Sequence, residues 1–97
     1  MNTLEKLLER KLRAAIEEKG GLCLKLSAQY FTGLPDRLCL LPGGQAFFVE
    51  LKSEGVKTSA RQAYVHWQLR KLGFHVFVVG TNDALDLTLT AAGYAKP

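Results

Sequence analysis

The stretch LCLLPGGQAFFVEL, residues 38–51, decides the fold, because two apolar runs flank Pro42-Gly43-Gly44. Consecutive glycines between strand-like runs are typical of a tight β-hairpin, whose turn requires positive φ angles. With the turn centred on these glycines, the numbers of antiparallel partners sum to about 86, so Asp36 is expected opposite Glu50. Lys52 lies two residues beyond Glu50 and falls on the same face of its strand. The hairpin therefore predicts that three charged side chains meet at one point.

Two facing carboxylates indicate a metal site. Like charges opposite each other on neighbouring strands destabilise a sheet, so a compensating cation is expected between Asp36 and Glu50. Mg²⁺ takes one or two carboxylates, keeps several waters and accepts phosphate oxygens in its remaining positions. Such an ion polarises a phosphate and lowers the pKa of a bound water, while the Lys52 ammonium would stabilise developing negative charge. The alternative is a surface hairpin with a cross-strand salt bridge.

The order of these residues resembles a known nuclease signature. Pro35-Asp36, a short spacer and Glu50-Leu51-Lys52 are similar to the PD-(D/E)XK motif. The similarity runs from about Glu5 to Gly80, most of the chain. A fuller pattern resembles the VRR-NUC branch, the virus-type replication-repair nucleases, and it consists of Gly20-Gly21, Lys25, Gly33-Leu34-Pro35-Asp36-Arg37, Phe48-Val49-Glu50-Leu51-Lys52 and Gln62.

This resemblance implies a Mg²⁺- or Mn²⁺-dependent endonuclease that hydrolyses DNA phosphodiester bonds, with branched DNA such as four-way Holliday junctions as the expected substrate. It implies that Asp36 and Glu50 bind the metal together with the Leu51 carbonyl, and that Lys52 is catalytic. It also implies a homodimer, since cutting two strands of a symmetric DNA structure needs two active sites. A free-standing domain that begins at Met1 would suit a virus or prophage.

A glutamate of the first helix often completes the metal site in the superfamily that the chain resembles. Glu5 and Glu9 lie four residues apart on one helix edge, so either could point toward the hairpin. Periodicity places Glu5 nearer the apolar stripe, whereas the spacing between Glu9 and Gly20 better matches related junction-cleaving nucleases. We favour Glu9 and keep Glu5 as the second candidate. The alternative for both is an exposed glutamate near a helix N-terminus.

Gln62 allows two interpretations. The stretch Ser59-Ala60-Arg61-Gln62 fits a capping box, in which the glutamine side chain reaches back to the Ser59 amide. Gln62 is also in register with Val65, Leu69 and Leu72, the stripe expected to face the sheet. Its amide would then lie beside the strand of Glu50 and Lys52. The resemblance favours a catalytic role, in which Gln62 contacts the scissile phosphate or the attacking water.

Four basic residues are candidates for nucleic-acid binding. The balance of 13 basic and 9 acidic residues gives a net charge of +4, which favours a polyanionic partner. Lys57 and Arg61 flank the second predicted helix, and Lys25 occupies a family position on a strand. Arg37 follows Asp36, so strand alternation sends it to the opposite face, where it is either structural or phosphate-contacting. A solvated surface charge is the alternative for the other three.

Residues 1–97 are expected to form one α/β domain, because a chain of this length buries roughly 60–65% of its unfolded surface and leaves no room for a second. The predicted order is αβββαβα. The resemblance implies a PD-(D/E)XK restriction-endonuclease-like core, a central mixed sheet flanked by helices. The predicted helices span 3–19, 59–72 and 82–93, and the predicted strands span 22–27, 38–41, 45–49 and 74–79.

The remaining features argue against other classes of protein. No apolar stretch approaches the ~20 residues that span a bilayer, and the amino-terminal segment lacks a signal-peptide core, so an intracellular location in a bacterial or virus-infected cell is expected. Cys23 and Cys39 have no metal-binding spacing and are interpreted as buried thiols. His66 and His75 are expected in surface or packing roles. No small-molecule cofactor is expected.

Two competing functions are kept. A restriction-like or nicking nuclease on duplex DNA would use the same charged residues, although nothing in the chain resembles an appended recognition domain. A non-catalytic DNA-binding module on the same fold would have lost a charged member of the set, whereas Asp36, Glu50 and Lys52 are all present. Exposed aromatic side chains such as Tyr64 or Trp67 could pack against a second subunit.

Overall fold

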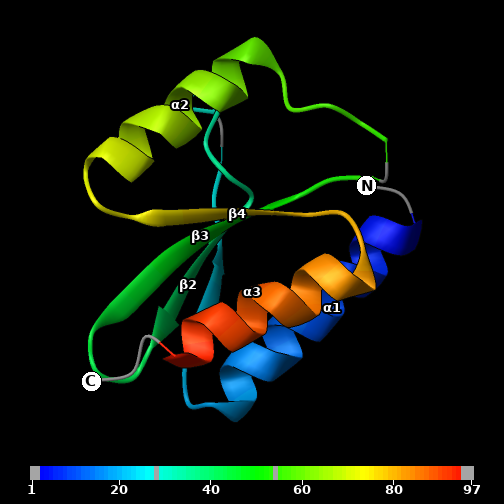
Figure 1. Ribbon diagram of the computed structural model, residues 1–97, viewed down its shortest axis with the longest axis vertical. Coiled ribbons are helices and arrows are strands. Elements are labelled where there is room, and N and C mark those ends of the chain that lie inside the picture. The colour runs from blue at the N-terminus through cyan, green and yellow to red at the C-terminus, as the bar shows by residue number, and fades with distance from the viewer. Residues whose placement is uncertain (1–2, 28, 54, 95–97) are drawn as a thin grey trace.

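The predicted hairpin forms the centre of a four-stranded sheet in the computed structural model, which describes residues 3–27, 29–53 and 55–94. The observed order αβββαβα confirms the prediction, and most helix and strand ends differ from the predicted ones by one or two residues (Figure 1). The elements are α1 (Thr3–Glu18), β1 (Leu22–Lys25), β2 (Arg37–Leu41), β3 (Gln45–Leu51), α2 (Ala60–Lys71), β4 (His75–Val79) and α3 (Asn82–Tyr94).

The sheet is mixed, as the resemblance implied. Its strand order is β1-β2-β3-β4, with antiparallel pairing between the first three strands and parallel pairing between β3 and β4. The antiparallel strands β2 and β3 need only a short turn, whereas the parallel pair β3 and β4 needs a crossover, and α2 lies in that crossover. The topology therefore places α2 directly after the strand that carries the Glu50-Leu51-Lys52 motif.

The register of the hairpin is the one that the glycine pair predicted. Gly43 and Gly44 both adopt positive φ angles, 89° and 77°. Arg37 pairs with Val49 at the open end of the ladder, and the next step of this register brings Asp36 opposite Glu50. The carboxylates that are far apart in sequence thus lie at the same end of the same two strands.

Helices cover both faces of the sheet, with α1 and α3 side by side on one face and α2 on the other (Figure 1). Alternation along β3 turns Phe47, Val49 and Leu51 into the main core. The same alternation turns Glu50 to the α2 face, where it is buried as well. The main core also contains Leu8, Leu12, Ile16, Cys39, Val79 and Leu85.

The packing beneath α2 is thinner and depends on polar contacts. Val65 and His66 are the buried residues of this helix. Arg70 Nη2 donates to the Val76 carbonyl at 2.7 Å, which fastens the second half of α2 to β4. Leu72, which the sequence placed on the sheet-facing stripe, is instead exposed at the C-cap, because the helix ends one residue before it. This correction leaves α2 with a shorter apolar face than its sequence suggested.

The loop before β2 packs tightly against the start of α2. Gly33 has a φ of 90°, and a Cβ atom at this position would lie 2.9 Å from the Arg61 carbonyl oxygen and 2.9 Å from Val65 Cγ2. Arg61 Nε donates to the Thr32 carbonyl at 3.1 Å. Only glycine tolerates both the positive φ and the close approach. Gly33 therefore brings the loop that leads to Asp36 against α2.

The two cysteines are free thiols on directly opposed positions of β1 and β2. Their sulfur atoms lie 3.9 Å apart, far beyond the length of a disulfide bond. Cys39 is buried in the core, and Cys23 is partly buried. Across the described part of the chain, no helix is both long and apolar enough to cross a lipid bilayer.

Candidate active site

Asp36 is fixed in place by backbone groups of two strands. Its Oδ2 atom accepts a hydrogen bond from the Leu51 amide at 2.7 Å, and its own carbonyl accepts one from the Leu26 amide at 2.9 Å. The preceding residue, Pro35, is fully buried and restricts its own φ. These contacts hold the carboxylate against β3, beside the peptide group that joins Glu50 to Leu51.

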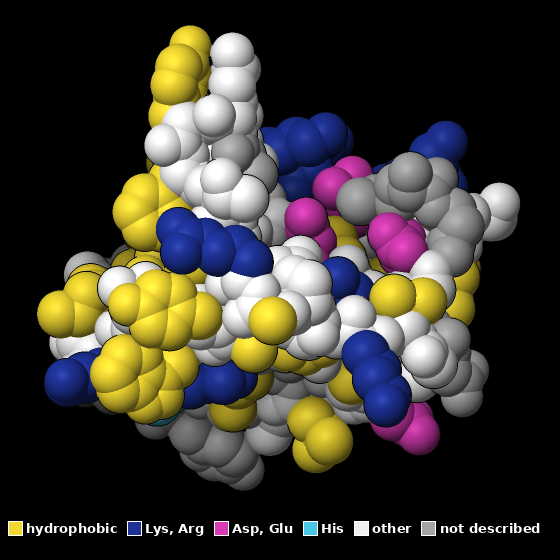
Figure 2. All heavy atoms as spheres, turned by 90° about the horizontal axis from the view of Figure 1, so that it is seen from above, with side chains coloured by type: hydrophobic (Ala, Val, Ile, Leu, Met, Phe, Trp, Pro, Cys, Tyr) yellow, Lys and Arg dark blue, Asp and Glu magenta, His cyan; other side chains and the backbone are white. Residues whose placement is uncertain are grey.

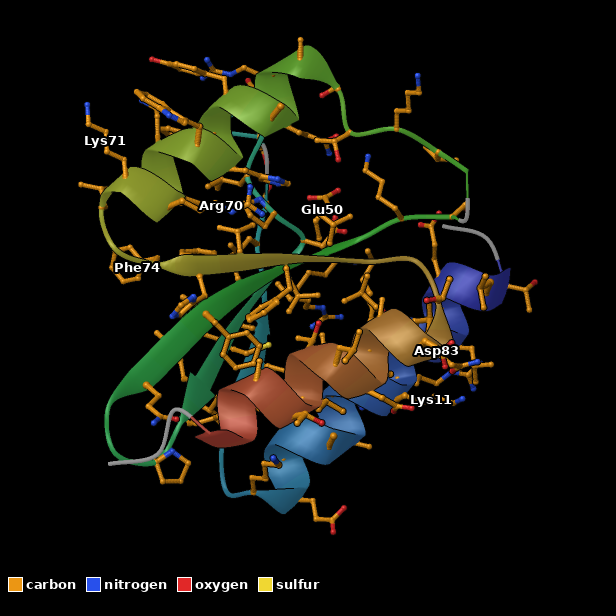
Figure 3. All side chains as sticks on the ribbon, viewed as in Figure 1. Lys11, Glu50, Arg70, Lys71, Phe74 and Asp83 are labelled. Carbon is orange, nitrogen blue, oxygen red and sulfur yellow. The ribbon has the colours of Figure 1, made fainter. Side chains whose placement is uncertain are left out.

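Glu50 is buried between the sheet and α2, where its label lies in Figure 3. Its side chain is only 2% exposed, and Oε2 accepts a hydrogen bond from Gln62 Nε2 at 2.9 Å. Lys52 Nζ lies 3.6 Å from the same oxygen. Oε1 has no hydrogen-bond partner among the residues that the structure describes. A buried carboxylate is thus only half satisfied by the protein around it.

Gln62 joins the two charged members of the motif and caps the helix at the same time. Its Oε1 atom accepts a hydrogen bond from Lys52 Nζ at 2.8 Å and a second from the Ser59 amide at 3.1 Å. Its backbone amide donates to Ser59 Oγ at 3.1 Å, which completes the capping box. The two interpretations of Gln62 are therefore compatible, because the cap aims its amide group at Glu50 and Lys52.

The carboxylates carry an electrostatic cost in the metal-free protein. Burial raises the pKa of Glu50 to about 7, the charge of Asp36 adds to the rise, and Lys52 and Gln62 oppose it. Burial also raises the pKa of Asp36, against the lowering effect of the Leu51 amide and of Lys52. The single ammonium of Lys52 does not offset the burial of two carboxylates. A second positive charge at this point would lower both pKa values.

His66 belongs to this site, although its sequence gave no sign of it. The residue is 2% exposed, and Nε2 lies 3.9 Å from Glu50 Oε1. Burial lowers the pKa of His66, and the charges of Arg70 and Lys52 lower it further. The only sequence signal is its position four residues after Gln62, which places both side chains on one face of α2. His75, by contrast, is exposed, in agreement with the expected surface role.

The structure separates the two glutamates of α1. Glu9 pairs with Arg37, with Oε2 2.8 Å from Nη2. Glu5 instead accepts a hydrogen bond from the hydroxyl of Ser53, the residue after Lys52. Burial is the main cause of the raised Asp36 pKa, and of the two glutamates Glu5 contributes more to it than Glu9. The geometry favours Glu5 as the helix glutamate nearest the site, although the sequence favoured Glu9.

The candidate nucleic-acid contacts are not gathered at one place. Arg37 is buried on the α1 face, where Nη1 also donates to the Cys23 carbonyl at 3.2 Å, so its structural interpretation fits the geometry better. Lys25 is exposed and pairs with Arg37 in the ladder, which aligns it with the face opposite Glu50. Lys57 is exposed before α2, and Arg61 lies on its first turn beside Gln62.

The donor set of the site fits a hard divalent cation. Asp36 and Glu50 supply oxygen atoms at one end of the hairpin, and Glu50 Oε1 is a buried acceptor without a partner in the described structure. Within residues 3–27, 29–53 and 55–94, no three His, Cys, Asp or Glu side chains are grouped as a closed metal site requires. Mg²⁺ and Mn²⁺ do not need such a group, because two carboxylates with waters and phosphate oxygens suffice.

Comparison with known proteins agrees with this geometry. No family model matches the chain. The protein named Putative nuclease p44 of Acyrthosiphon pisum secondary endosymbiont phage 1 is 35% identical over 79 residues, which cover 81% of this chain and 85% of the relative. A solved structure described as a VRR_NUC domain superimposes with a TM-score of 0.84 and 37% identity, over 92% of this chain and 97% of the other. Its sheet and helices have the PD-(D/E)XK-like arrangement, and the chain belongs to the VRR-NUC family of nuclease domains.

Proposed function

We propose that this protein is a Mg²⁺- or Mn²⁺-dependent DNA endonuclease. The observation that carries the proposal is the convergence of Asp36, Glu50 and Lys52 beneath α2, with Gln62 bonded to both Glu50 and Lys52. The phage relative whose printed name is that of a nuclease supports the same conclusion. A purely structural ion pair would leave no reason for a second buried carboxylate at the same end of the hairpin.

Asp36 and Glu50 would hold the ion, with the Leu51 carbonyl and Glu5 as the nearest further oxygen donors. When bound, the ion supplies charge neutralisation at the phosphate and a water of lowered pKa. The protein prepares for this with Leu51, whose amide holds one oxygen of Asp36, and with Gln62, whose amide holds one oxygen of Glu50. One oxygen of each carboxylate is thus fixed and the other is left to face a ligand.

Lys52 is proposed to stabilise the negative charge that develops on the phosphate oxygens in the transition state. Its ammonium lies between Glu50 and Gln62, 3.6 Å from a Glu50 oxygen and 2.8 Å from the Gln62 amide oxygen. These contacts restrict the long side chain to one direction before the substrate arrives, so little reorganisation is needed. Gln62 acts here as a positioning residue for Lys52.

Branched DNA is the proposed substrate, cut by a homodimer whose two sites act on two strands. The resemblance to virus-type replication-repair nucleases and the phage relative support this assignment, together with a cellular site of action in bacteria or infected cells. Duplex cleavage by a restriction-like or nicking enzyme is the competing activity. A non-catalytic module is disfavoured because every charged residue of the motif is in place.

Cleavage assays on defined substrates would test the proposal. Labelled four-way junction, flap and linear duplex are incubated with the protein in Mg²⁺, in Mn²⁺ and in EDTA, beside the Asp36→Asn variant. We expect metal-dependent cutting that is fastest on the junction and absent from the variant. Equal cutting of the linear duplex would favour the restriction-like alternative. Cutting that persists in EDTA or in Asp36→Asn would refute the metal-dependent mechanism.

A further inference from the structure

A row of rings and cations covers the outer side of α2 and does not take part in the site described above. It consists of Phe31, Arg61, Tyr64, Trp67 and Lys71, which we call the aromatic row. The Arg61 guanidinium lies 5.9 Å from the Phe31 ring centroid and 5.8 Å from that of Tyr64. Tyr64 stacks on Trp67 with centroids 6.1 Å apart, and Lys71 Nζ lies 5.0 Å from the Trp67 centroid. Cation and ring therefore alternate along most of the helix.

These rings are not part of a core. Phe31, Tyr64 and Trp67 are 48%, 49% and 55% exposed. Figure 2 looks down on this side of the molecule and shows hydrophobic side chains interleaved with Lys and Arg side chains, with acidic side chains gathered on the neighbouring part of the same face. Figure 3 shows Lys71 pointing away from the body at the end of α2 that is remote from Glu50. Large rings held partly exposed in a fixed arrangement offer their faces to a ligand.

The charge of the row points to a polyanion. The α2 sequence contains Arg61, Arg70 and Lys71 and no acidic residue. Among the described residues, none of these three forms an ion pair with a carboxylate. A symmetric contact between two copies through this face would bring two sets of unneutralised cations together, which is unfavourable. Nucleic acid combines the two properties that match the row, a negative backbone and flat aromatic groups.

One end of the row adjoins the active site. Arg61 immediately precedes Gln62, and its Nε atom donates to the Thr32 carbonyl. The loop continues from Thr32 through Gly33, which packs against the Arg61 backbone, to Asp36. A strand that passes from the carboxylates onto α2 would meet Arg61 first and then the exposed rings.

We infer that the aromatic row binds unpaired nucleotides of the DNA strand next to the scissile phosphate, by stacking their bases on Phe31, Tyr64 and Trp67. This inference rests on the proposed nuclease function and narrows its substrate to DNA with a single-stranded segment beside the cut. Bases in an intact duplex are stacked on each other and cannot present their faces to a side chain. The row therefore selects for branch points and splayed strands without reading sequence.

Trp67 makes a direct test possible, because it is the only tryptophan of the chain. Metal-free protein in EDTA is titrated with oligo(dT) and with a blunt duplex, and tryptophan emission is followed beside the anisotropy of labelled DNA. We expect oligo(dT) to quench the emission of Trp67. The Tyr64→Leu and Phe31→Leu variants should each bind oligo(dT) about 5- to 100-fold more weakly and bind duplex within about twofold of wild type.

The matched control is Leu87→Ala, an equally exposed apolar residue on α3, across the sheet from the row. Circular dichroism verifies that each variant is folded, and sedimentation reports its oligomeric state. Unquenched emission with unchanged oligo(dT) affinity in both ring variants would overturn the inference. So would a loss of dimer in Tyr64→Leu without a loss of oligo(dT) affinity, since the row would then serve a second copy.

Because these titrations contain no metal, their outcome is independent of hydrolysis. Ring-dependent binding by a protein that cuts no substrate would uphold the row and refute the nuclease proposal. Metal-dependent cutting with ring-independent binding would refute the row alone.

Discussion

His66 Nε2 and Glu50 Oε1 face each other at 3.9 Å in the protein interior, and neither atom has a hydrogen-bond partner in the described structure. A buried polar atom without a partner costs about 1–3 kcal/mol of stability. Native proteins retain few such atoms, and those that remain mark functional sites more often than packing errors. The pair therefore identifies the point at which this fold gives up stability for a ligand.

The pH dependence of stability should report Glu50 in the metal-free protein. Because its folded pKa of about 7 lies above its ordinary value of 4.5, its contribution is fully present below the ordinary pKa and is lost as the pH rises through about 7. Wild-type protein in EDTA should lose on the order of 3 kcal/mol of unfolding free energy between pH 5 and pH 8 from this group. Urea titrations of Glu50→Gln should lack that loss.

The control for this measurement is Glu17→Gln, which alters an exposed carboxylate in an (i, i+4) pair with Arg13. Its curve of stability against pH should follow that of wild type. A Glu50→Gln curve parallel to wild type would show that burial of this carboxylate does not raise its pKa.

Asp36 should separate catalysis from stability according to the replacement. Asp36→Asn keeps an oxygen acceptor for the Leu51 amide, whereas Asp36→Ala leaves that buried amide unpaired at a cost of about 1–3 kcal/mol. We expect both variants to lose cleavage and only the alanine variant to lose stability. Thermal unfolding and single-turnover assays would measure the two effects. A cleaving Asp36→Asn protein would remove Asp36 from the metal site.

Gln62 can be divided into its two roles with a neighbouring control. Ser59→Ala removes the cap hydroxyl, at a cost of about 1 kcal/mol, and leaves the amide contacts of Gln62 to Glu50 and Lys52. Gln62→Glu keeps a capping-box side chain but places a carboxylate against Glu50. Cleavage should fall about 100-fold or more in Gln62→Glu and stay within a few-fold in Ser59→Ala below its melting temperature. Equal losses in the two variants would mean that Gln62 acts only as a cap.

Arg37 should prove structural rather than phosphate-contacting. Its guanidinium is buried with Glu9, so Arg37→Met leaves a partly buried carboxylate unpaired and should cost about 3–5 kcal/mol. Adding Glu9→Gln should recover much of that loss. The salt dependence of DNA binding should not change in the double variant, whereas Arg61→Ala should reduce the slope of log affinity against log salt by about one. A reduced slope in the double variant would indicate a phosphate contact.

The sequence predicted the parts of the site that depend on local geometry. A glycine pair fixes the hairpin turn, and strand alternation then places Asp36, Glu50 and Lys52 together, so these positions followed from spacing alone. The cap at Ser59 was equally local, because Gln62 lies three residues further along the same turn. Such features need no knowledge of how distant elements pack.

Features that depend on packing between elements were missed or misplaced. The burial of His66 requires the β3–α2–β4 crossover to lay α2 on the sheet, and a lone histidine carries no local sign of that. Glu5 and Glu9 share one helix edge, and only the position of Arg37 on β2 decides which of them is taken up by an ion pair. Hydrophobic periodicity gives the face of a helix but not the partner that a polar residue on its rim will find.

The double role of the Gln62 oxygen ties chemistry to the integrity of one helical turn. If the first turn of α2 frays, the Ser59 cap opens and both charged residues on β3 lose their shared partner in the same event. That turn has few apolar contacts to hold it, so its opening requires less free energy than unfolding the α1–α3 core. Heat inactivation should therefore begin several degrees below the midpoint of global melting, and the enzyme would fail by local loosening while most of its structure is still intact.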